Sequence, residues 1–109
     1  MDSIKKEAER TLYFRTINGN KFLHKEDGPA VIWNSGDTEY FVNDKYHRID
    51  GPAVDYKNLK IWYVHGVRHR SDGAALISDS YKKYYYKGKV VDVNNDEDFA
   101  NFIKFKAFW

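Results

Sequence analysis

The chain has 109 residues, a formal net charge of +2, 17% aromatic residues and no cysteine. This length suits one small domain, the absence of cysteine excludes disulfides and thiolate chemistry, and the small charge does not indicate a nucleic-acid-binding protein. The N-terminal segment is charged and lacks the apolar stretch of a signal peptide, and no apolar run approaches the roughly 20 residues of a membrane span. We therefore expect a soluble cytoplasmic protein with no membrane span.

The chain divides into three segments of a single domain, 1–109. Residues 1–13 precede the repeated part of the sequence, and we expect them to cap that end of the fold, with a short helix in the charged stretch 2–10. Residues 14–93 hold the repeats, and residues 94–109 form a C-terminal helical segment. The aromatic and β-branched residues of the middle segment favour a sheet.

An eight-residue phrase recurs along the middle segment. It reads HKEDGPAV at 24–31, HRIDGPAV at 47–54 and HRSDGAAL at 69–76, so its histidines are 23 and 22 residues apart. A fourth, decayed copy falls near Val91. A fixed period of this length indicates a repeat architecture, and it has room for two strands and two turns in each unit.

The turns between the strands are visible in the sequence. Four two-residue turns between apolar runs predict tight hairpins, at Asn18-Gly19, Asn43-Asp44, His65-Gly66 and Lys87-Gly88. The other connections are expected to be four-residue loops, at 34–37, 57–60 and 79–82. In each phrase we expect the glycine to supply a positive φ, the aspartate to cap the turn, and the prolines to lie where the strand pairing pauses.

The sequence thus predicts a mainly β fold. We expect an antiparallel meander, or hairpin solenoid, of three to four repeats of 22–23 residues with a C-terminal capping helix at Asp96–Ala107. Phe99, Phe102 and Ile103 share one face of that helix at helical spacing, and Asn94 to Asp96 are suitable N-cap residues. The remaining aromatic residues, Phe105, Phe108 and Trp109, either fill the core or join two subunits into a homo-oligomer.

The aromatic residues before the tight turns repeat in phase, so we expect them to form a ladder on one face of the sheet. Tyr, Trp and Arg dominate protein–protein contacts. The candidate partner-binding residues are Trp33, Tyr40, Trp62, Tyr84, Arg48 and Arg70. With Lys25, the two arginines form a basic row that either pairs with the neighbouring aspartates or meets an acidic partner.

The repeated histidines and aspartates are expected to be structural. Equivalent residues two strands apart are separated by roughly 9–10 Å, which is too far for one metal ion to join them. The structural repeat residues are His24, Asp27, Gly28, His47, Asp50, Gly51, His69, Asp72 and Gly73. We predict no metal site, no cofactor and no catalytic residue; an enzyme built on His47 and Asp50 is the alternative that this prediction opposes.

The phrase followed by an aromatic hairpin, as in WYVHGVRH at 62–69 and the Asp-Gly after it, resembles MORN-type repeats, in the degenerate form found in bacterial and phage proteins. The resemblance covers about residues 14–93, although many hairpin glycines of the family are Asp, Lys or Asn here. It implies an elongated sheet of hairpins and a non-enzymatic scaffold that binds protein or lipid. By analogy it implies a phage-encoded effector or inhibitor of a host defence protein. A weaker likeness is to choline-binding cell-wall repeats, whose Gly-Trp signature is missing.

The main alternative function is binding of a nucleotide or single-stranded nucleic acid. Basic and aromatic residues alternate in YKKYYYKGK at 81–89, a combination that can stack bases and hold phosphates. No P-loop, G-x-S-x-G, H-E-x-x-H or paired-cysteine motif is present. The sequence therefore favours a non-enzymatic module that binds another protein, with nucleic acid as the second candidate.

Overall fold

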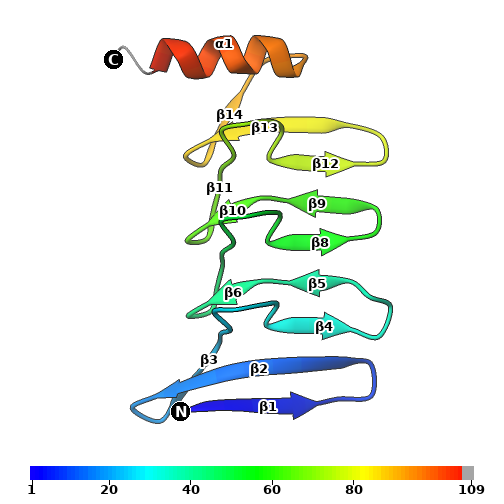
Figure 1. Cartoon of the computed structure of the whole chain (residues 1–109), viewed down its shortest axis with the longest axis vertical. Coiled ribbons are helices and arrows are strands. Elements are labelled where there is room, and N and C mark those ends of the chain that lie inside the picture. Colours follow the sequence, from blue (N-terminus) through cyan, green and yellow to red (C-terminus); the bar gives the residue numbers. More distant parts are fainter. Residues whose placement is uncertain (107–109) are drawn as a thin grey trace.

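A computed structural model describes residues 1–106 and shows an open antiparallel sheet with a single C-terminal helix (Figure 1). The molecule is an elongated slab of 44 × 31 × 18 Å. The elements are β1 (Asp2–Lys6), β2 (Arg10–Ile17), β3 (Asn20–Leu23), β4 (Val31–Trp33), β5 (Thr38–Glu39), β6 (Phe41–Val42), β7 (Lys45–Tyr46), β8 (Val54–Tyr56), β9 (Leu59–Ile61), β10 (Tyr63–Val64), β11 (Val67–Arg68), β12 (Leu76–Ser78), β13 (Lys82–Tyr86), β14 (Lys89–Val91) and α1 (Asp96–Lys106). The mainly β, hairpin-based fold with one C-terminal helix is confirmed.

Successive hairpins stack along the long axis of the slab. The order of the ten-stranded sheet, β1-β2-β4-β5-β8-β9-β12-β13-β14, follows the chain, with β3 attached to β2. Hairpins β4/β5 and β8/β9 are joined because Thr38 and Glu39 pair with Asp55 and Val54. Strands β6/β7 and β10/β11 form two short hairpins beside this sheet. Among the described residues, none forms a helix long and apolar enough to cross a membrane.

All four expected tight turns are confirmed. Both residues of each turn have positive φ, from Asn18 (51°) and Gly19 (80°) to Lys87 (49°) and Gly88 (84°). Left-handed φ at both central positions defines the type I′ turn, whose twist matches that of the flanking strands. His65 and Lys87 adopt this conformation at a steric cost, because neither is glycine or asparagine.

Two of the expected four-residue loops are shorter in the structure. The loop at 34–37 is confirmed, but only residues 57–58 separate β8 from β9, and residues 79–81 separate β12 from β13. At the first of these, the strand pairing runs up to the turn, with Tyr56 opposite Leu59 and Asp55 opposite Lys60. The Lys60 ammonium binds the Asp55 carboxylate across this pair and stabilises the tighter connection.

The helix expected at residues 2–10 is wrong, because β1 occupies most of this segment. Asp2 to Lys6 pair with Arg15 to Thr11 of β2. A helix of this length is marginal in water unless its apolar face is packed, whereas β2 provides a partner for every second peptide group of β1. The N-terminal segment is therefore the first strand of the sheet.

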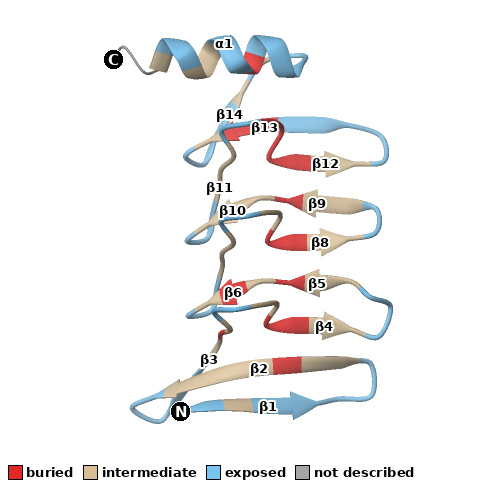
Figure 2. Cartoon of the chain, viewed as in Figure 1, coloured by how far each residue is buried: buried red, intermediate tan, exposed pale blue. Residues whose placement is uncertain are grey.

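A row of directly paired buried residues crosses the sheet and forms its core. Leu12, Val31, Glu39, Val54, Ile61 and Leu76 are each opposite the next member of the row. All six are buried, and Figure 2 shows the buried parts of β2, β4, β5, β8, β9 and β12 above one another. Each repeat contributes two equivalent residues to the row. The buried residues of successive repeats therefore contact one another and form a continuous core.

Helix α1 covers the C-terminal end of the sheet. The Asn95 side chain accepts a hydrogen bond from the Asp98 backbone N–H at 2.8 Å, which is the N-cap arrangement expected at this position. Phe99 is 1% exposed and its ring lies 5.0 Å from that of Tyr84 in β13. The predicted helix is confirmed from Asp96 to Lys106, while Ala107, Phe108 and Trp109 lie outside the described residues.

Candidate protein-binding face

The histidine of each phrase holds the tight turn of the following unit. The Nδ1 atoms of His24, His47 and His69 accept hydrogen bonds from the backbone N–H groups of Asn43, His65 and Lys87, at 3.0, 2.9 and 2.9 Å. The second residue of each turn donates to the carbonyl of the residue before the histidine, as Gly66 does to Tyr46 at 2.7 Å. Two hydrogen bonds thus fix each of these three turns to the unit before it, and the three histidines have the structural role that was expected of them.

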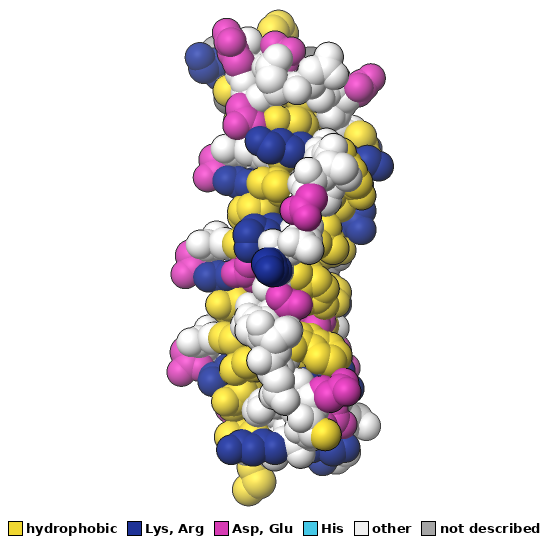
Figure 3. All heavy atoms as spheres, turned by 90° about the vertical axis from the view of Figure 1, so that its right-hand side faces the viewer, with side chains coloured by type: hydrophobic (Ala, Val, Ile, Leu, Met, Phe, Trp, Pro, Cys, Tyr) yellow, Lys and Arg dark blue, Asp and Glu magenta, His cyan; other side chains and the backbone are white. Residues whose placement is uncertain are grey.

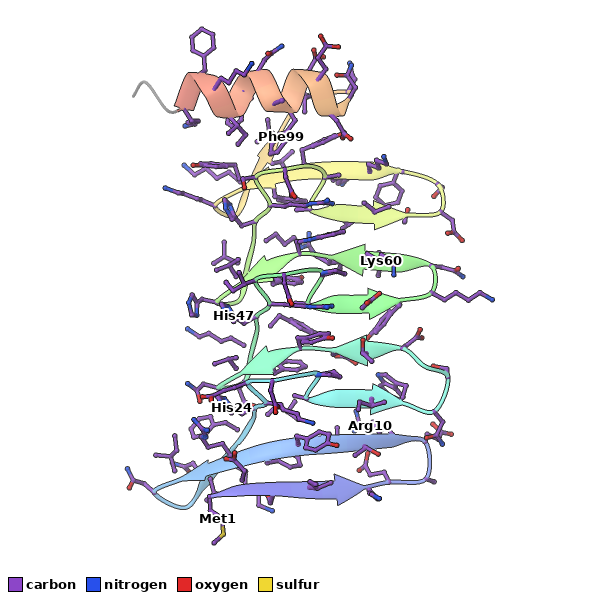
Figure 4. All side chains as sticks on the ribbon, in the orientation of Figure 1. Met1, Arg10, His24, His47, Lys60 and Phe99 are labelled. Atoms are coloured by element: carbon purple, nitrogen blue, oxygen red, sulfur yellow. The ribbon has the colours of Figure 1, made fainter. Side chains whose placement is uncertain are left out.

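This arrangement requires neutral histidines that carry their proton on Nε2. Burial lowers the pKa of His47, and the adjacent His65 ring, stacked at 4.2 Å, lowers it further. Burial also lowers the pKa of His69, with a smaller contribution from Lys87. His24 is the most buried of the three, and its Nε2 lies 3.4 Å from Glu26 Oε1. Figure 4 shows His24 and His47 on the same side of the molecule, one above the other.

The residue after each histidine lies over an aromatic ring. Lys25 Nζ is 3.9 Å from the centre of the Tyr13 ring, Arg48 Cζ is 4.0 Å from that of Tyr40, and Arg70 Cζ is 3.9 Å from that of Trp62. Each of these cation–π contacts is worth roughly 0.5–2 kcal/mol, depending on how far the cation is shielded from water. Three successive units therefore carry the same cation–aromatic pair.

Further contacts fix the two guanidinium groups. Arg48 donates to the Asp50 carboxylate at 3.0 Å and to the Pro52 carbonyl at 3.1 Å, and Arg70 makes the same bonds to Asp72 and Ala74, at 2.7 and 3.0 Å. The arginines hold the pKa values of Asp50 and Asp72 below their usual range, chiefly through these hydrogen bonds. The interpretation of the basic row as paired with the phrase aspartates is confirmed for both arginines.

The phrase glycines have a different role from the one expected. The glycines with positive φ are Gly19, Gly36, Gly66 and Gly88, so Gly28, Gly51 and Gly73 adopt an ordinary backbone conformation. A Cβ atom on Gly51 would lie 2.9 Å from Arg48 Cζ, and one on Gly73 would lie 3.1 Å from Arg70 Cζ. Gly51 and Gly73 are therefore required because a side chain there would collide with the guanidinium that lies over the aromatic ring.

Shallow grooves separate successive phrases on this side of the sheet, which we call the grooved face. The middle groove, of about 490 Å³, is bordered by Lys25, Tyr40, His47, Arg48 and Ile49. The C-terminal groove, of about 650 Å³, is bordered by Arg48, Ile49, Trp62, His69 and Arg70. An N-terminal groove of about 400 Å³ includes Ile4, Tyr13 and His24. Ile49 is 78% exposed and borders two grooves.

The charged groups of the molecule follow the repeat. Figure 3 shows basic and acidic side chains beside each other at steps along one margin, with hydrophobic side chains between the steps. Asp50 and Asp72 are exposed, while Arg48 and Arg70 are largely covered by their contacts. The grooved face thus presents exposed carboxylates and Ile49 above fixed cation–aromatic pairs.

The six predicted partner-binding residues do not lie together. Tyr40, Arg48, Trp62 and Arg70 border the middle and C-terminal grooves. Trp33 instead packs with Leu12, Val31 and Phe41, on the face of the buried row, because it lies two residues after Val31 in β4 and residues two apart in a strand share a face. Tyr84 is buried against Phe99 and donates a hydrogen bond to Asp96 at 2.6 Å. Burial and this bond raise the pKa of Tyr84 to about 12. The single aromatic ladder that was expected is therefore divided between two faces and the helix contact.

The basic and aromatic hairpin 81–89 presents few exposed rings. Tyr84 and Tyr85 are buried, and Tyr86 is half-buried with its ring 5.9 Å from Phe102 of α1. Arg68 donates to the Tyr85 hydroxyl at 3.0 Å. Tyr81 is the exposed tyrosine of this segment.

The buried carboxylate of Glu39 was not predicted from the sequence. It accepts hydrogen bonds from Trp33 Nε1 at 2.7 Å and from the Tyr46 hydroxyl at 3.0 Å. Burial and interaction with Glu39 raise the pKa of Tyr56 to about 12. Glu39 occupies the position that Ile61 takes one repeat later, and a charged residue at an otherwise apolar repeat position is the signal that would have identified it.

Neither a metal centre nor a family assignment emerges for the described part of the chain. Residues 1–106 contain no group of three or more His, Asp or Glu side chains placed to hold a metal ion. The comparisons with known proteins found no matching family model, no matching curated protein and no matching solved structure.

Proposed function

We propose that this chain is a non-enzymatic module that binds another protein through its grooved face. The observation that carries this proposal is the set of cation–aromatic pairs Arg48–Tyr40 and Arg70–Trp62 along the grooves. Arginine, tyrosine and tryptophan are the residue types on which binding energy at protein interfaces concentrates. Because both arginines already have several fixed contacts, a partner that binds here meets side chains whose conformational entropy is largely lost before binding.

The chemistry of the face also indicates the kind of partner. Exposed carboxylates of Asp50 and Asp72 flank the exposed Ile49 side chain. A complementary segment would place an apolar side chain against Ile49 and basic groups against the aspartates. This is a mixed polar and apolar contact, typical of interfaces between proteins that also exist separately.

The finer interpretation rests on the sequence resemblance. We infer a MORN-like hairpin solenoid in which each 22–23-residue repeat contributes one hairpin and one groove border. The repeat-to-repeat equivalence of the histidine and arginine contacts supports this interpretation. A phage-encoded inhibitor that acts on a host defence protein in the host cytoplasm is the biological role we infer from the same resemblance.

Binding of single-stranded nucleic acid is the less favoured alternative. Base stacking needs exposed aromatic rings beside basic groups. In the hairpin 81–89, Tyr84 and Tyr85 are buried in the protein. The pairs on the grooved face are also occupied, since a guanidinium covers each ring.

The test is capture of a partner from a native lysate by the immobilised chain, compared with two matched variants. Ile49→Glu changes an exposed side chain that borders two grooves, and Val90→Glu makes the same change at an exposed position away from them. We expect Ile49→Glu to lose the captured protein and Val90→Glu to retain it, with native circular dichroism for both. Equal capture by the two variants, or binding of oligonucleotides at low salt that Ile49→Glu leaves intact, would contradict the proposal.

A further inference from the structure

Strand β1 is an open edge of the ten-stranded sheet. It pairs with β2 alone, and no other element of residues 1–106 lies beyond it. In Figure 1 it forms the end of the stack opposite α1. Ile4 is 59% exposed on this strand, although it lies in a paired element. An edge strand offers a row of unpaired N–H and C=O groups to another strand.

The pairing with β2 defines which peptide groups of β1 are free. Met1 exchanges two hydrogen bonds with Thr16, through its amino group at 3.2 Å and its carbonyl at 2.9 Å, and the Glu7 N–H donates to the Arg10 carbonyl at 2.8 Å. Bonded pairs alternate along an antiparallel ladder, so Ser3 and Lys5 also bond to β2. Asp2, Ile4 and Lys6 therefore direct their N–H and C=O groups towards the open edge.

We propose that two copies of this chain pair antiparallel through β1, with Ile4 of one copy opposite Ile4 of the other. This register places Asp2 of each copy opposite Lys6 of the second copy, and each of the three outward residues both donates and accepts a backbone hydrogen bond. The sequence of β1, DSIKK, is complementary to itself in charge about Ile4. Opposite charges directly across an antiparallel pair are stabilising, and like charges are destabilising.

Charge selects this register over its neighbours. Moving one copy by two residues in one direction places Lys5 opposite Lys5 and leaves Asp2 without a basic partner. Moving it by two residues in the other direction places Asp2 opposite Ile4 and leaves Lys6 without an acidic partner. Lysine on an edge strand normally prevents such pairing. Here the Asp2 carboxylate, two-thirds exposed and 3.2 Å from Arg15, has a second oxygen with which to bind Lys6 of the second copy.

The two-fold axis of this pairing is perpendicular to the sheet, so the same face of both copies lies on the same side of the combined sheet. Asp2, Ile4 and Tyr13 border the N-terminal groove, which would continue from one copy into the other. The result is one sheet formed from two ten-stranded sheets, with α1 at each outer end. This inference does not depend on the proposed binding partner.

Sedimentation velocity of the full chain across micromolar concentrations tests the proposal, and we expect a reversible dimer. Ile4→Pro removes an outward N–H and no bond to β2, and we expect it to remain monomeric with native circular dichroism. Asp2→Lys and Lys6→Asp each create like-charge pairs and should weaken the dimer by about tenfold, whereas the double variant should restore it.

Three outcomes would overturn the proposal. The first is a monomer at every concentration. The second is a dimer unaffected by Ile4→Pro or by the single charge reversals. The third is a dimer that the double charge reversal fails to restore or that Phe105→Lys alone abolishes, and the latter result would assign the contact to the C-terminal segment.

Discussion

The two halves of the sheet share one repeat but are stabilised differently. In the C-terminal half, residues 47–106, the row of buried residues is apolar, arginines cover the aromatic rings, and α1 closes the end of the sheet. In the N-terminal half, residues 1–46, Glu39 interrupts the row, a lysine lies over Tyr13, and β1 leaves the edge open. A period in the sequence therefore fixes the backbone arrangement, while stability depends on the few positions at which the units differ.

Removal of the helix contact should have the largest effect on this comparison. Phe99→Ala deletes a ring that is 1% exposed and packed between Tyr84 and Phe102, and we expect it to lower the free energy of unfolding by about 3–5 kcal/mol. Urea denaturation measures the change. Phe105→Ala, at a position 67% exposed on the same helix, is the control and should change stability by less than about 0.5 kcal/mol. Equal effects of the two variants would show that α1 does not stabilise the end of the sheet.

The buried polar cluster of the N-terminal half should give the next largest effect. Glu39→Leu leaves Trp33 Nε1 and the Tyr46 hydroxyl without their acceptor, and we expect a loss of about 2–3 kcal/mol. The double variant Glu39→Leu, Tyr46→Phe removes one of these unpaired donors and should recover part of the loss. Thermal and urea unfolding measure both variants. A Glu39→Leu protein as stable as the wild type would mean that the hydrogen bonds to Glu39 add no stability and that the row of buried residues accepts leucine in the N-terminal half as it does in the C-terminal half.

The phrase glycines provide a smaller, matched comparison. Gly51→Ala forces the Arg48 guanidinium away from its ring and its carbonyl partner, and should cost about 1–2 kcal/mol. At Gly28 the nearest atom is Lys25 Cε at 3.8 Å, an ordinary contact, so Gly28→Ala should be neutral or stabilise by about 0.5 kcal/mol through the unfolded state. The urea unfolding midpoints of the two variants and the wild type show which substitution destabilises the chain more. A larger loss for Gly28→Ala than for Gly51→Ala would contradict the proposal that contact with the guanidinium is what requires glycine.

Local signals predicted most of the backbone arrangement. Turns such as Asn18-Gly19 were found because left-handed φ restricts the residue types that the turn accepts. Helix α1 was found because its cap, its acidic first turn and its apolar spacing all lie within one segment. The helix expected at residues 2–10 was wrong because β1 depends on a partner strand, β2, that helix propensity does not take into account.

The parts of the site that depend on strand register were not predictable in the same way. Trp33 lies in β4 and Tyr40 between β5 and β6, and their faces were assigned without the register that places them on opposite sides. The role of Gly51 depends on where the Arg48 guanidinium packs, which no local propensity encodes. The Glu39 cluster draws on Trp33 and Tyr46 from neighbouring strands, so its donors became visible only in the folded sheet.

The smallest expected effect is a pH dependence that belongs mainly to the C-terminal half. Because the pKa values of His47 and His69 are lowered in the folded chain, the unfolded chain binds protons more readily at acidic pH. Their contribution to stability is therefore complete above the unfolded histidine pKa of about 6.5 and decreases as the pH falls below it towards the lowered folded values. The double variant His47→Asn, His69→Asn retains an acceptor for the turn N–H groups but cannot titrate in this range. Urea unfolding at steps between neutral and mildly acidic pH should show a shallower decline for the variant than for the wild type. Identical slopes would mean that the unfolded chain takes up no more protons at these histidines than the folded chain, which would contradict the lowered pKa values of His47 and His69.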